Sequence, residues 1–403
     1  MNILMLPSLY HPHLGGVELV VGNLARQFVA MGHRVEIVTT RWPRDLPSRE
    51  VVDGIKVTRL PFALPLTLKS TATLPLRLLQ SYCGLKKVLA STHSDLVNLH
   101  YLAEAAFYAG LCCRAQNVPI VASIHGSDIE LIPNRSGLQR RVTTRLLREA
   151  AAIVANSKYL ANSACRLAGE GIRPQVTTIG NAVALPRLET LTEPPGGLPA
   201  RYILGVGRLI KTKGFDLLVR AFATLEAARP DTHLVVVGDG IERTALQQLS
   251  ASFGLADRVH FVGRMPNEAI PAYMRHAELV AVPSRREGFG LVALEAMACR
   301  KAVVAMPVGG LPEVVSDGQS GLLAAEPTAK ALGESLAFLL DRPKLAEEFG
   351  RRGRQLVESR NTWRLVAESY VRIFESVLQI EPGIRGGLKQ QSARIQASVS
   401  RDS

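Results

Sequence analysis

The sequence is poor in aromatic residues, which make up 5% of its 403 residues, and its five cysteines show no disulfide or metal-ligand spacing. Few aromatic side chains leave little surface for stacking nucleic-acid bases, and no nucleic-acid motif is found. No apolar run approaches the ~18 residues needed to cross a bilayer. Residues 1–6 lack the basic start and the apolar stretch of a signal peptide. We therefore expect a protein of the reducing cytoplasm that does not span a membrane.

Two common ligand motifs are absent as well. No Gly-x-Gly-x-x-Gly fingerprint follows the first expected strand, which disfavours an enzyme that binds NAD. No Asp-x-Asp pair is present to hold a divalent cation beside a phosphate. We therefore expect neither a metal nor a cofactor. Negative charge on a leaving group would be stabilised by fixed cations and by the positive N-termini of helices.

Positive charge is unevenly distributed. The formal net charge is +13, and +9 of it falls in residues 1–186, which hold 20 Lys and Arg against 11 Asp and Glu. This indicates an anionic partner, and a lipid surface or a lipid diphosphate fits better than nucleic acid. Residues 61–90 are rich in leucine and interspersed with Lys and Arg. They are typical either of a basic helix on a membrane surface or of a crossover helix packed under a sheet, and the sequence leaves both open.

The alternation of short apolar runs with helical patterns predicts an α/β chain of two domains. At 403 residues the chain exceeds the size at which a single core stops growing. Strands are expected at residues 2–6, 35–39, 54–60, 95–99, 119–124, 153–157, 176–179, 202–206, 233–237 and 259–262. A Pro- and Gly-rich segment separates the halves. The expected parts are domains at 1–185 and 201–362, a linker at 186–200, a helix at about 363–379 that packs on the first domain, and a disordered tail at 381–403.

Polar residues follow several expected strands of the first half, and parallel sheets bind ligands at such strand ends. Gly15 and Gly16 form a turn between the first strand and a helix, which suits either a phosphate or simply a tight turn. His100 and His125 each follow a strand, and Asp128 comes three residues later. We take His100 and Asp128 as candidates for the acceptor side of a site.

The densest pattern lies at residues 283–321. Glu287 stands in a glycine-rich loop, and Glu295 lies eight residues on, inside a helix expected at 290–298. Gly309 and Gly310 form a second glycine turn before another helical pattern. Glycines before a helix expose its N–H groups, and such a site suits a phosphate.

Two cations, Arg208 and Lys213, flank the loop after the strand expected at 202–206. The negative charge on a diphosphate leaving group grows as the bond to the transferred group breaks. A guanidinium and an ammonium fixed beside it can stabilise that charge.

The 283–321 stretch resembles the nucleotide-binding signature of the family 4 retaining glycosyltransferases. The residues that carry the resemblance are Pro283, Ser284, Glu287, Gly288, Gly290, Glu295, Ala296, Met297, Ala298, Gly309, Gly310, Pro312 and Glu313. The likeness runs over nearly the whole chain but is specific only in residues 205–321. It implies the GT-B architecture, in which two Rossmann-like parallel-sheet domains face each other across a cleft.

The resemblance also implies roles for single residues. Glu287 would hold hydroxyls of the donor sugar, Glu295 would hold the ribose, and His125 would lie beside the donor sugar. Arg208 and Lys213 would clamp the diphosphate. Further contacts to the donor are expected from Gly15, Gly16, Gly207, Gly238, Gly263, Arg264, Gly288, Phe289, Gly290 and Leu291. The expected catalytic set is Glu287, His125, Arg208 and Lys213, without a protein nucleophile.

Three positions depart from the family pattern. Arg300 stands where glycine is usual and is expected to crowd the turn after the helix. Ala182 follows Asn181 where a second glycine is common, and Ala184 replaces a frequent aspartate. The two alanines would weaken contacts of the interdomain loop.

The sequence thus predicts a retaining glycosyltransferase that moves a hexose from a UDP- or GDP-sugar to a glycan or lipid-linked acceptor, in the synthesis of cell-surface polysaccharide or glycolipid. We expect it in the cytoplasm, with peripheral contact to the anionic inner face of the membrane. Two alternatives stay open: a sugar-nucleotide-binding partner subunit without turnover, and a GT-B epimerase or hydrolase. The intact set of charged residues argues against the first, and turnover without an acceptor would identify the second.

Overall fold

The computed structural model describes residues 1–13, 15–62, 74–132, 137–169, 174–191, 197–225 and 228–380. The chain divides into two compact units. The first comprises Met1–Ala155, Ala161–Ile179 and the chain from Ala367 onward, and the second comprises Asn156–Leu160 and Gly180–Val366. A short segment of the first half, residues 156–160, thus belongs to the second unit. The tail expected at 381–403 lies outside the described residues, as do 63–73 of the leucine-rich stretch.

The first unit is built on an eight-stranded sheet in the order β3-β4-β2-β1-β5-β6-β7-β8. Its strands are β1 (Asn2–Pro7), β2 (Arg34–Thr40), β3 (Arg49–Val52), β4 (Ile55–Leu60), β5 (Leu96–His100), β6 (Ile120–Ile124), β7 (Ala152–Ala155) and β8 (Gln175–Thr178). Among these strands, neighbours pair in parallel except β3 and β4. The sequence pattern did not predict β3, because its four residues begin with two charged side chains and lack a buried face.

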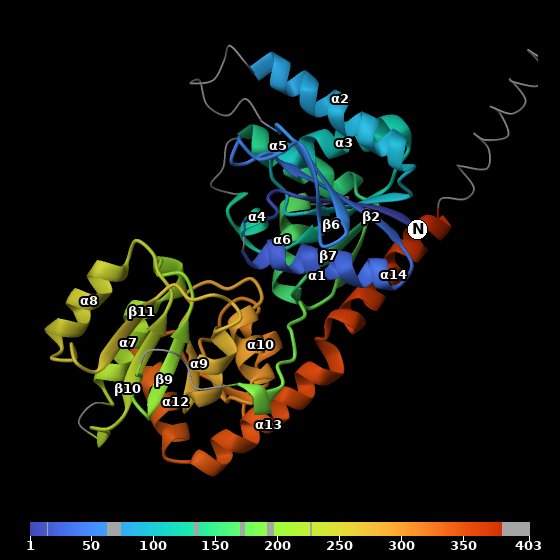
Figure 1. Cartoon of the computed structure of the whole chain (residues 1–403). Helices are drawn as coiled ribbons and strands as arrows, with labels where there is room; N and C mark the ends of the chain where they lie inside the picture. The colour runs from blue at the N-terminus through green and yellow to red at the C-terminus, as the bar shows by residue number, and fades with distance from the viewer. Residues whose placement is uncertain are drawn as a thin grey trace, which may run out of the picture. The chain divides into compact units, whose positions relative to one another are not determined.

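The helices of the first unit follow the strands in alternation. They are α1 (Gly16–Ala30), α2 (Leu74–Thr92), α3 (Glu104–Gln116), α4 (Ser127–Glu130), α5 (Gly137–Glu149), α6 (Lys158–Ala168), which begins in the second unit, and α14 (Trp363–Ile380), which ends in the first. Phe28 of α1 packs on Tyr370 and Phe374 of α14, with ring centroids 6.3 and 5.5 Å apart. The red helix α14 accordingly lies beside the blue helix α1 in Figure 1. The last helix thus completes the core of the first unit.

The second unit has a fully parallel six-stranded sheet in the order β11-β10-β9-β12-β13-β14. Its strands are β9 (Tyr202–Val206), β10 (His233–Val237), β11 (Val259–Gly263), β12 (Leu279–Val282), β13 (Val303–Ala305) and β14 (Gly321–Leu323). Its helices are α7 (Phe215–Ala223), α8 (Arg243–Ser252), α9 (Ile270–His276), α10 (Leu291–Ala298), α11 (Leu311–Val314), α12 (Ala329–Leu340) and α13 (Pro343–Arg360). The predicted α/β class is therefore confirmed, with two parallel-sheet units.

Both faces of the second sheet are buried, which explains why its strands read as continuous apolar runs. Successive strand residues point to opposite faces. Ile203 and Leu234 pack in one apolar cluster with α7, α8 and α12, whereas Leu204 and Val235 pack in the other with α9, α10 and α11. The helices on both faces leave the two ends of the strands as the places where loops gather.

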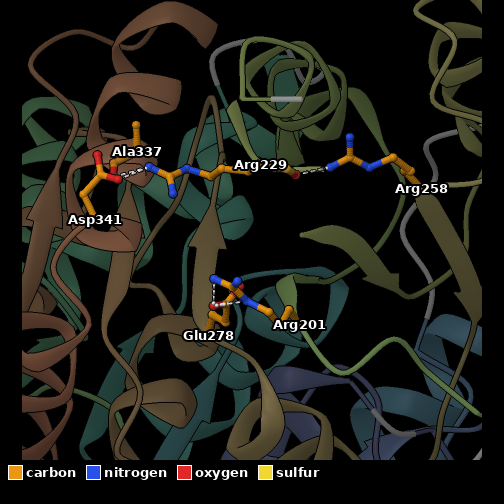
Figure 2. A network of polar contacts seen from close by, with 6 residues as sticks. All are labelled: Arg201, Arg229, Arg258, Glu278, Ala337 and Asp341. Carbon is orange, nitrogen blue, oxygen red and sulfur yellow. Dashed lines mark hydrogen bonds and ion pairs between the residues drawn. The ribbon is translucent and has the colours of Figure 1, made fainter. Parts of the chain in front are cut away.

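The amino end of the second sheet is held by arginines (Figure 2). Arg201, just before β9, donates to the carboxylate of Glu278, just before β12, at 3.0 and 3.1 Å. Arg258, before β11, donates to the carbonyl oxygen of Arg229 at 2.6 Å, and Arg229 in turn bonds to Asp341 after α12. Charge-assisted bonds of this kind are stronger than neutral ones. They fasten the end of the sheet at which the strands begin, opposite their carboxyl ends.

Arg300 ends α10 in a way that corrects the expectation of crowding. Its N–H donates to the carbonyl of Met297 and that of Lys301 donates to Ala296, each at 3.0 Å. This is the Schellman pattern, in which the residue at the position of Arg300 takes the left-handed conformation and is usually glycine. Arg300 has φ of +57° and an exposed side chain. The departure therefore costs backbone strain and does not crowd the turn.

We expect Arg300→Gly to stabilise the protein. Relief of a left-handed non-glycine residue is worth about 1 kcal/mol, which raises the thermal midpoint of a unit of this size by about 2–4 °C. Differential scanning calorimetry of the two proteins measures this. Arg300→Ala is the matched control, because it keeps the Cβ atom and should gain nothing. An equal rise in both variants would place the cost in the arginine side chain.

Candidate active site

Four loops of the second unit meet at the carboxyl ends of its strands. They follow β10, β9, β12 and β13, which are consecutive neighbours in the sheet. Ligands of open parallel sheets bind at this edge. At each junction between these loops a glycine lies against a carbonyl oxygen of the next loop.

The loops after β9 and β10 are joined first. A Cβ atom on Gly238 would lie 1.8 Å from the carbonyl oxygen of Gly207, and one on Gly240 would lie 2.4 Å from that of Leu209. Both distances are shorter than any non-bonded contact, so only glycine fits. The N–H of Gly207 donates to Val237 at 3.0 Å, which fixes the start of the loop that carries Arg208.

The loop after β9 is also fastened to the loop after β12. A Cβ atom on Gly214, where φ is +68°, would lie 2.1 Å from the carbonyl oxygen of Pro283. Arg285 reaches back and binds both carboxylate oxygens of Asp216 at 2.5 and 2.7 Å. This bond lowers the pKa of Asp216, so the carboxylate stays ionised. A bidentate pair adds geometric precision to the junction.

The loop at residues 283–290, called the Glu287 loop below, rests in turn on the turn after β13. A Cβ atom on Gly309 would lie 1.8 Å from the carbonyl oxygen of Glu287, and one on Gly310 would lie 2.5 Å from that of Gly288. The N–H of Gly310 donates to the Glu287 carbonyl at 2.9 Å. The main chain directly after the Glu287 Cα atom is therefore held against the turn that follows β13.

Glu287 and Lys213, which lie on different loops, form an ion pair at this edge. The Lys213 Nζ atom lies 2.7 Å from the Glu287 Oε2 atom, which also accepts from the Ser284 hydroxyl at 3.1 Å. The two charged side chains are 25% and 15% exposed, so water screens their attraction only in part. Arg208 on the same loop as Lys213 is exposed, and so is Arg264, directly after β11. Lys213 is thus paired with Glu287, whereas Arg208 and Arg264 are exposed cations at the same end of the sheet.

Glu295 lies on the second turn of α10. Gly290, with φ of +115°, precedes this helix, and among the described residues no side chain caps its N-terminus. Burial raises the pKa of Glu295 to about 7, so the carboxyl group titrates near neutral pH. Phe289 is buried against the core of the unit and holds the loop between the two glutamates.

The predicted residues of the first unit form a separate group. His100 Nδ1 and His125 Nε2 lie 3.0 Å apart, and His100 Nε2 lies 2.6 Å from the Asn98 side-chain oxygen. Burial lowers the pKa of His125 to about 4 and that of His100 well below its ordinary value, so both rings are neutral. Gly15 and Gly16 lie at the start of α1, as expected.

Asp128 shows an interaction that differs from the one predicted. Its carboxylate is fully buried and accepts from the N–H groups of Gly126 at 2.7 Å, His125 at 3.2 Å and Leu102 at 3.4 Å. Burial raises its pKa to about 6 against the lowering effect of these donors. The carboxylate therefore holds its own loop, and the acceptor contact stays a prediction.

Sequence reasoning missed several residues that shape the site. Arg285, Asp216 and Ser157 fasten the loops, yet each reads in the sequence as an ordinary charged or capping residue. Ser157 directly precedes a helix, which signals a cap, but nothing in the sequence indicates its bond to Gly288, 131 residues away. Ala182 and Ala184, which depart from the family pattern, follow Asn181. The carbonyl oxygen of Asn181 accepts from the Asn361 side chain at 2.8 Å.

Within the described residues, no group of three or more His, Cys, Asp and Glu side chains is placed to hold a metal ion. In the same part of the chain, no helix is long and apolar enough to cross a membrane.

Two family profiles match the chain. The profile of a family described as "Glycosyl transferases group 1" matches residues 197–356, and that of "Glycosyltransferase Family 4" matches residues 14–187. The chain is 34% identical over 357 residues to a D-inositol 3-phosphate glycosyltransferase of Salinispora tropica, covering 81% of this chain and 74% of the relative.

Two more distant proteins are similar over most of their length. A GDP-mannose-dependent alpha-(1-6)-phosphatidylinositol monomannoside mannosyltransferase of Mycolicibacterium smegmatis is 28% identical, covering 90% of this chain and 95% of the relative. The crystal structure of Anabaena HepE in complex with UDP-glucose superposes with a TM-score of 0.74 at 22% identity, covering 93% of this chain and 99% of that one.

The raised pKa of Glu295 makes stability depend on pH. The unfolded chain releases this proton near pH 4.5, whereas the folded chain holds it up to about pH 7. Unfolding is therefore increasingly favoured as the pH rises through that window, by up to about 3 kcal/mol. We expect Glu295→Gln to gain stability relative to the parent at pH 8 but not at pH 4.5, as measured by urea unfolding of both proteins. A difference that stays constant with pH would contradict the shift.

Proposed function

The chain belongs to glycosyltransferase family 4, and we propose that it is a retaining hexosyltransferase that uses a UDP- or GDP-sugar and a glycan or lipid-linked acceptor. The observation that carries the proposal is the ion pair between Lys213 and Glu287 at 2.7 Å. The two residues lie on loops whose glycines approach neighbouring carbonyl oxygens so closely that no Cβ atom would fit. A lone surface pair would contribute little. A pair fixed at the carboxyl edge of a parallel sheet is placed for a ligand that carries both anionic groups and hydroxyls.

A nucleoside diphosphate sugar has both kinds of group. Its diphosphate would take the ammonium of Lys213, and its sugar hydroxyls would donate to the Glu287 carboxylate. Donor binding would thus exchange the internal ion pair for two contacts to one molecule. Lys213 would then face the diphosphate and Glu287 would accept hydrogen bonds from the hydroxyls, so neither charged group would be left without a partner.

The leaving diphosphate is stabilised by fixed cations in this proposal. Arg208 is exposed and lies five residues before Lys213, and the uncapped N-terminus of α10 adds N–H groups and a favourable dipole. We propose that these groups act without a divalent metal. The diphosphate itself would help to take the proton of the acceptor during attack on the same face of the sugar, which retains its configuration.

The remaining predicted contacts concern the ribose, the base and the acceptor. Glu295, once ionised, would accept from the ribose hydroxyls, while Gly238, Gly263 and Arg264 would border the nucleotide. Neutral His125 would hydrogen-bond to the donor sugar without adding charge. Thermal-shift screening against UDP, GDP, ADP and their sugars would identify the base, because a bound ligand raises stability by mass action.

Helix α2 supports peripheral attachment of the first unit to an anionic membrane. Its inner face is buried through Leu85, Val88 and Leu89, as expected of a crossover helix. Its other face exposes Leu76 and Leu79, 58% and 60% accessible, followed by the exposed pair Lys86 and Lys87. Apolar side chains beside lysines fit the headgroup region of an anionic bilayer. Such an attachment suits transfer to a lipid-linked acceptor in glycolipid or polysaccharide synthesis.

Four variants separate the proposed roles. Arg208→Ala and Lys213→Ala should lower kcat by roughly 10²- to 10³-fold, because the charge they face grows toward the transition state. Glu295→Gln should act mainly on the KM of the donor, at about 1–3 kcal/mol, and Glu287→Gln should lower kcat with little loss of affinity for free nucleoside diphosphate. The measurements are steady-state release of nucleoside diphosphate in EDTA and calorimetric binding.

Lys211→Ala is the matched control, because its exposed side chain lies in the same turn as Lys213. A parent protein inactive in EDTA but active with Mg²⁺ would contradict the proposed metal-free clamp. Loss of nucleotide binding in Glu287→Gln but not in Glu295→Gln would reverse the two roles. Turnover that no added glycan or lipid-linked acceptor accelerates would identify an epimerase or hydrolase.

We expect salt-sensitive co-sedimentation with phosphatidylserine-containing vesicles. Each lysine near such a surface contributes about 1 kcal/mol, so Lys86→Ala with Lys87→Ala should reduce partitioning by about 10- to 30-fold. Leu76→Ser with Leu79→Ser should reduce it as well. Ile241→Ser, which changes an 89% exposed apolar residue of the second unit, is the control. Equal binding to neutral and anionic vesicles would contradict this attachment.

A further inference from the structure

Two carbonyl groups of the Glu287 loop are held from outside the loop, each by a different segment. The Glu287 carbonyl accepts from the N–H of Gly310 at 2.9 Å. The Gly288 carbonyl accepts from the hydroxyl of Ser157 at 2.6 Å. Ser157 is fully buried and lies in residues 156–160, which belong to the second unit. The two successive peptide groups that follow the Glu287 Cα atom are thus each held from outside the loop.

The Ser157 hydroxyl has a second bond that orients it. It accepts from the N–H of Leu160 at 3.2 Å, which makes Ser157 the N-cap of α6. A hydroxyl has a single hydrogen, and here the acceptor bond to the helix leaves that hydrogen for Gly288. The geometry of the cap therefore determines the direction of the bond to the Glu287 loop.

Glu313 fixes the same helix start from another side. Its carboxylate accepts from the N–H groups of Lys158 at 2.7 Å and Tyr159 at 3.0 Å. Together with the bond from Leu160 to Ser157, the first three N–H groups of α6 are satisfied. A carboxylate at this positive helix end is also favoured electrostatically.

These bonds close a ring. Glu313 stands on α11, which begins directly after Gly310, and Gly310 lies against the Glu287 loop. The ring runs from Gly288 through Ser157 to the first turn of α6, then through Glu313 and Gly310 back to Glu287. Three hydrogen bonds of the ring join different segments: Ser157 to Gly288, Lys158 to Glu313 and Gly310 to Glu287. The other two steps, within the start of α6 and from Glu313 to Gly310, run along the chain.

We propose that Ser157 and Glu313 are positioning residues that hold the Glu287 carboxylate in place against the transferred sugar. The inference rests on the proposed function of Glu287. Both side chains bond within the protein: the Ser157 hydroxyl bonds to Gly288 and Leu160, and the two Glu313 carboxylate oxygens accept from Lys158 and Tyr159 of α6. Their effect on the reaction passes through the main chain of the Glu287 loop. A shift of that peptide would misplace the carboxylate relative to the sugar, while Lys213 and Arg208 would keep the diphosphate.

The test compares kcat, donor KM, nucleoside diphosphate affinity and thermal midpoint in the full chain. Ser157→Ala and Glu313→Gln should each lower kcat by about 5- to 10-fold, as for the loss of one good hydrogen bond, and leave the Kd of UDP or GDP within about twofold. Ser157→Thr keeps the hydroxyl and should restore kcat. Donor turnover is measured as release of nucleoside diphosphate from UDP-glucose and GDP-mannose, with water as acceptor where no other acceptor is used.

Thr328→Ala is the matched control. Thr328 caps α12 in the same unit by accepting from the N–H of Ala331 at 3.2 Å, but it has no bond to the Glu287 loop. It should lower the thermal midpoint without a change in kcat. A fall in kcat in Ser157→Ala that Thr328→Ala reproduces at equal loss of stability would overturn the inference, because capping alone would then explain it.

Two further outcomes are distinguishable. If Glu287→Gln lowers kcat but both Ser157→Ala and Glu313→Gln leave it unchanged, the positioning role is wrong and the proposed function stands. If Glu287→Gln itself leaves kcat unchanged, the proposed function of Glu287 fails, and the inference fails with it. Should Ser157→Ala not fold, Glu313→Gln alone decides, since it keeps the size of the side chain.

Discussion

The site depends on how closely main chains approach one another without side chains between them. Gly238, Gly214 and Gly309 each lie so near a carbonyl oxygen of a neighbouring loop that an added Cβ atom would stand about 2 Å away or less. Because the loops after β10, β9, β12 and β13 are joined in sequence, a change at any junction is transmitted to the next. Buried carbonyls at such junctions need hydrogen-bond partners, and the N–H groups of Gly207 and Gly310 are bonded there. The arrangement is therefore set before a ligand binds.

The internal pairing of Lys213 with Glu287 adds a second property to this rigid edge. Two partly buried charges without partners would destabilise the unit, and each serves as the partner of the other. A ligand that engages only one of them leaves the other without its ionic partner. A free nucleoside diphosphate would engage only Lys213, whereas a full donor would engage both Lys213 and Glu287. In the proposed mode of binding, a complete donor would be favoured because it offers a partner to both side chains. Arg285 and Asp216 form a second, bidentate pair across the same junction.

Sequence periodicity located most strands of both sheets, because strands buried on two faces appear as uninterrupted apolar runs. It missed β3, which is short, polar and at an edge, and it also missed β12 and β14, which are only four and three residues long. The motif around Glu287 identified the family, but no pattern paired Glu287 with Lys213 or Ser157, since hydrogen bonds between loops leave no periodic trace. The carboxylate of Asp128 binds N–H groups of its own loop, as Asp side chains often do, and the sequence analysis did not predict these bonds. At Arg300 the sequence predicted that a bulky side chain would crowd the turn, whereas the energetic cost lies in the positive φ of the backbone.

The return of α14 to the first unit bears on the order in which the protein folds. Phe28 completes its packing on Tyr370 and Phe374, which are synthesised only after the whole sheet of the second unit. Until then the apolar face of α1 lacks its partner. The second unit needs, beyond the segment 156–160, only the continuous stretch 180–366, which is synthesised before α14 is complete. Domains generally fold as they emerge, the N-terminal one first. Here the unit begun first is the unit finished last, and its exposed helix face is what a chaperone would meet on the nascent chain.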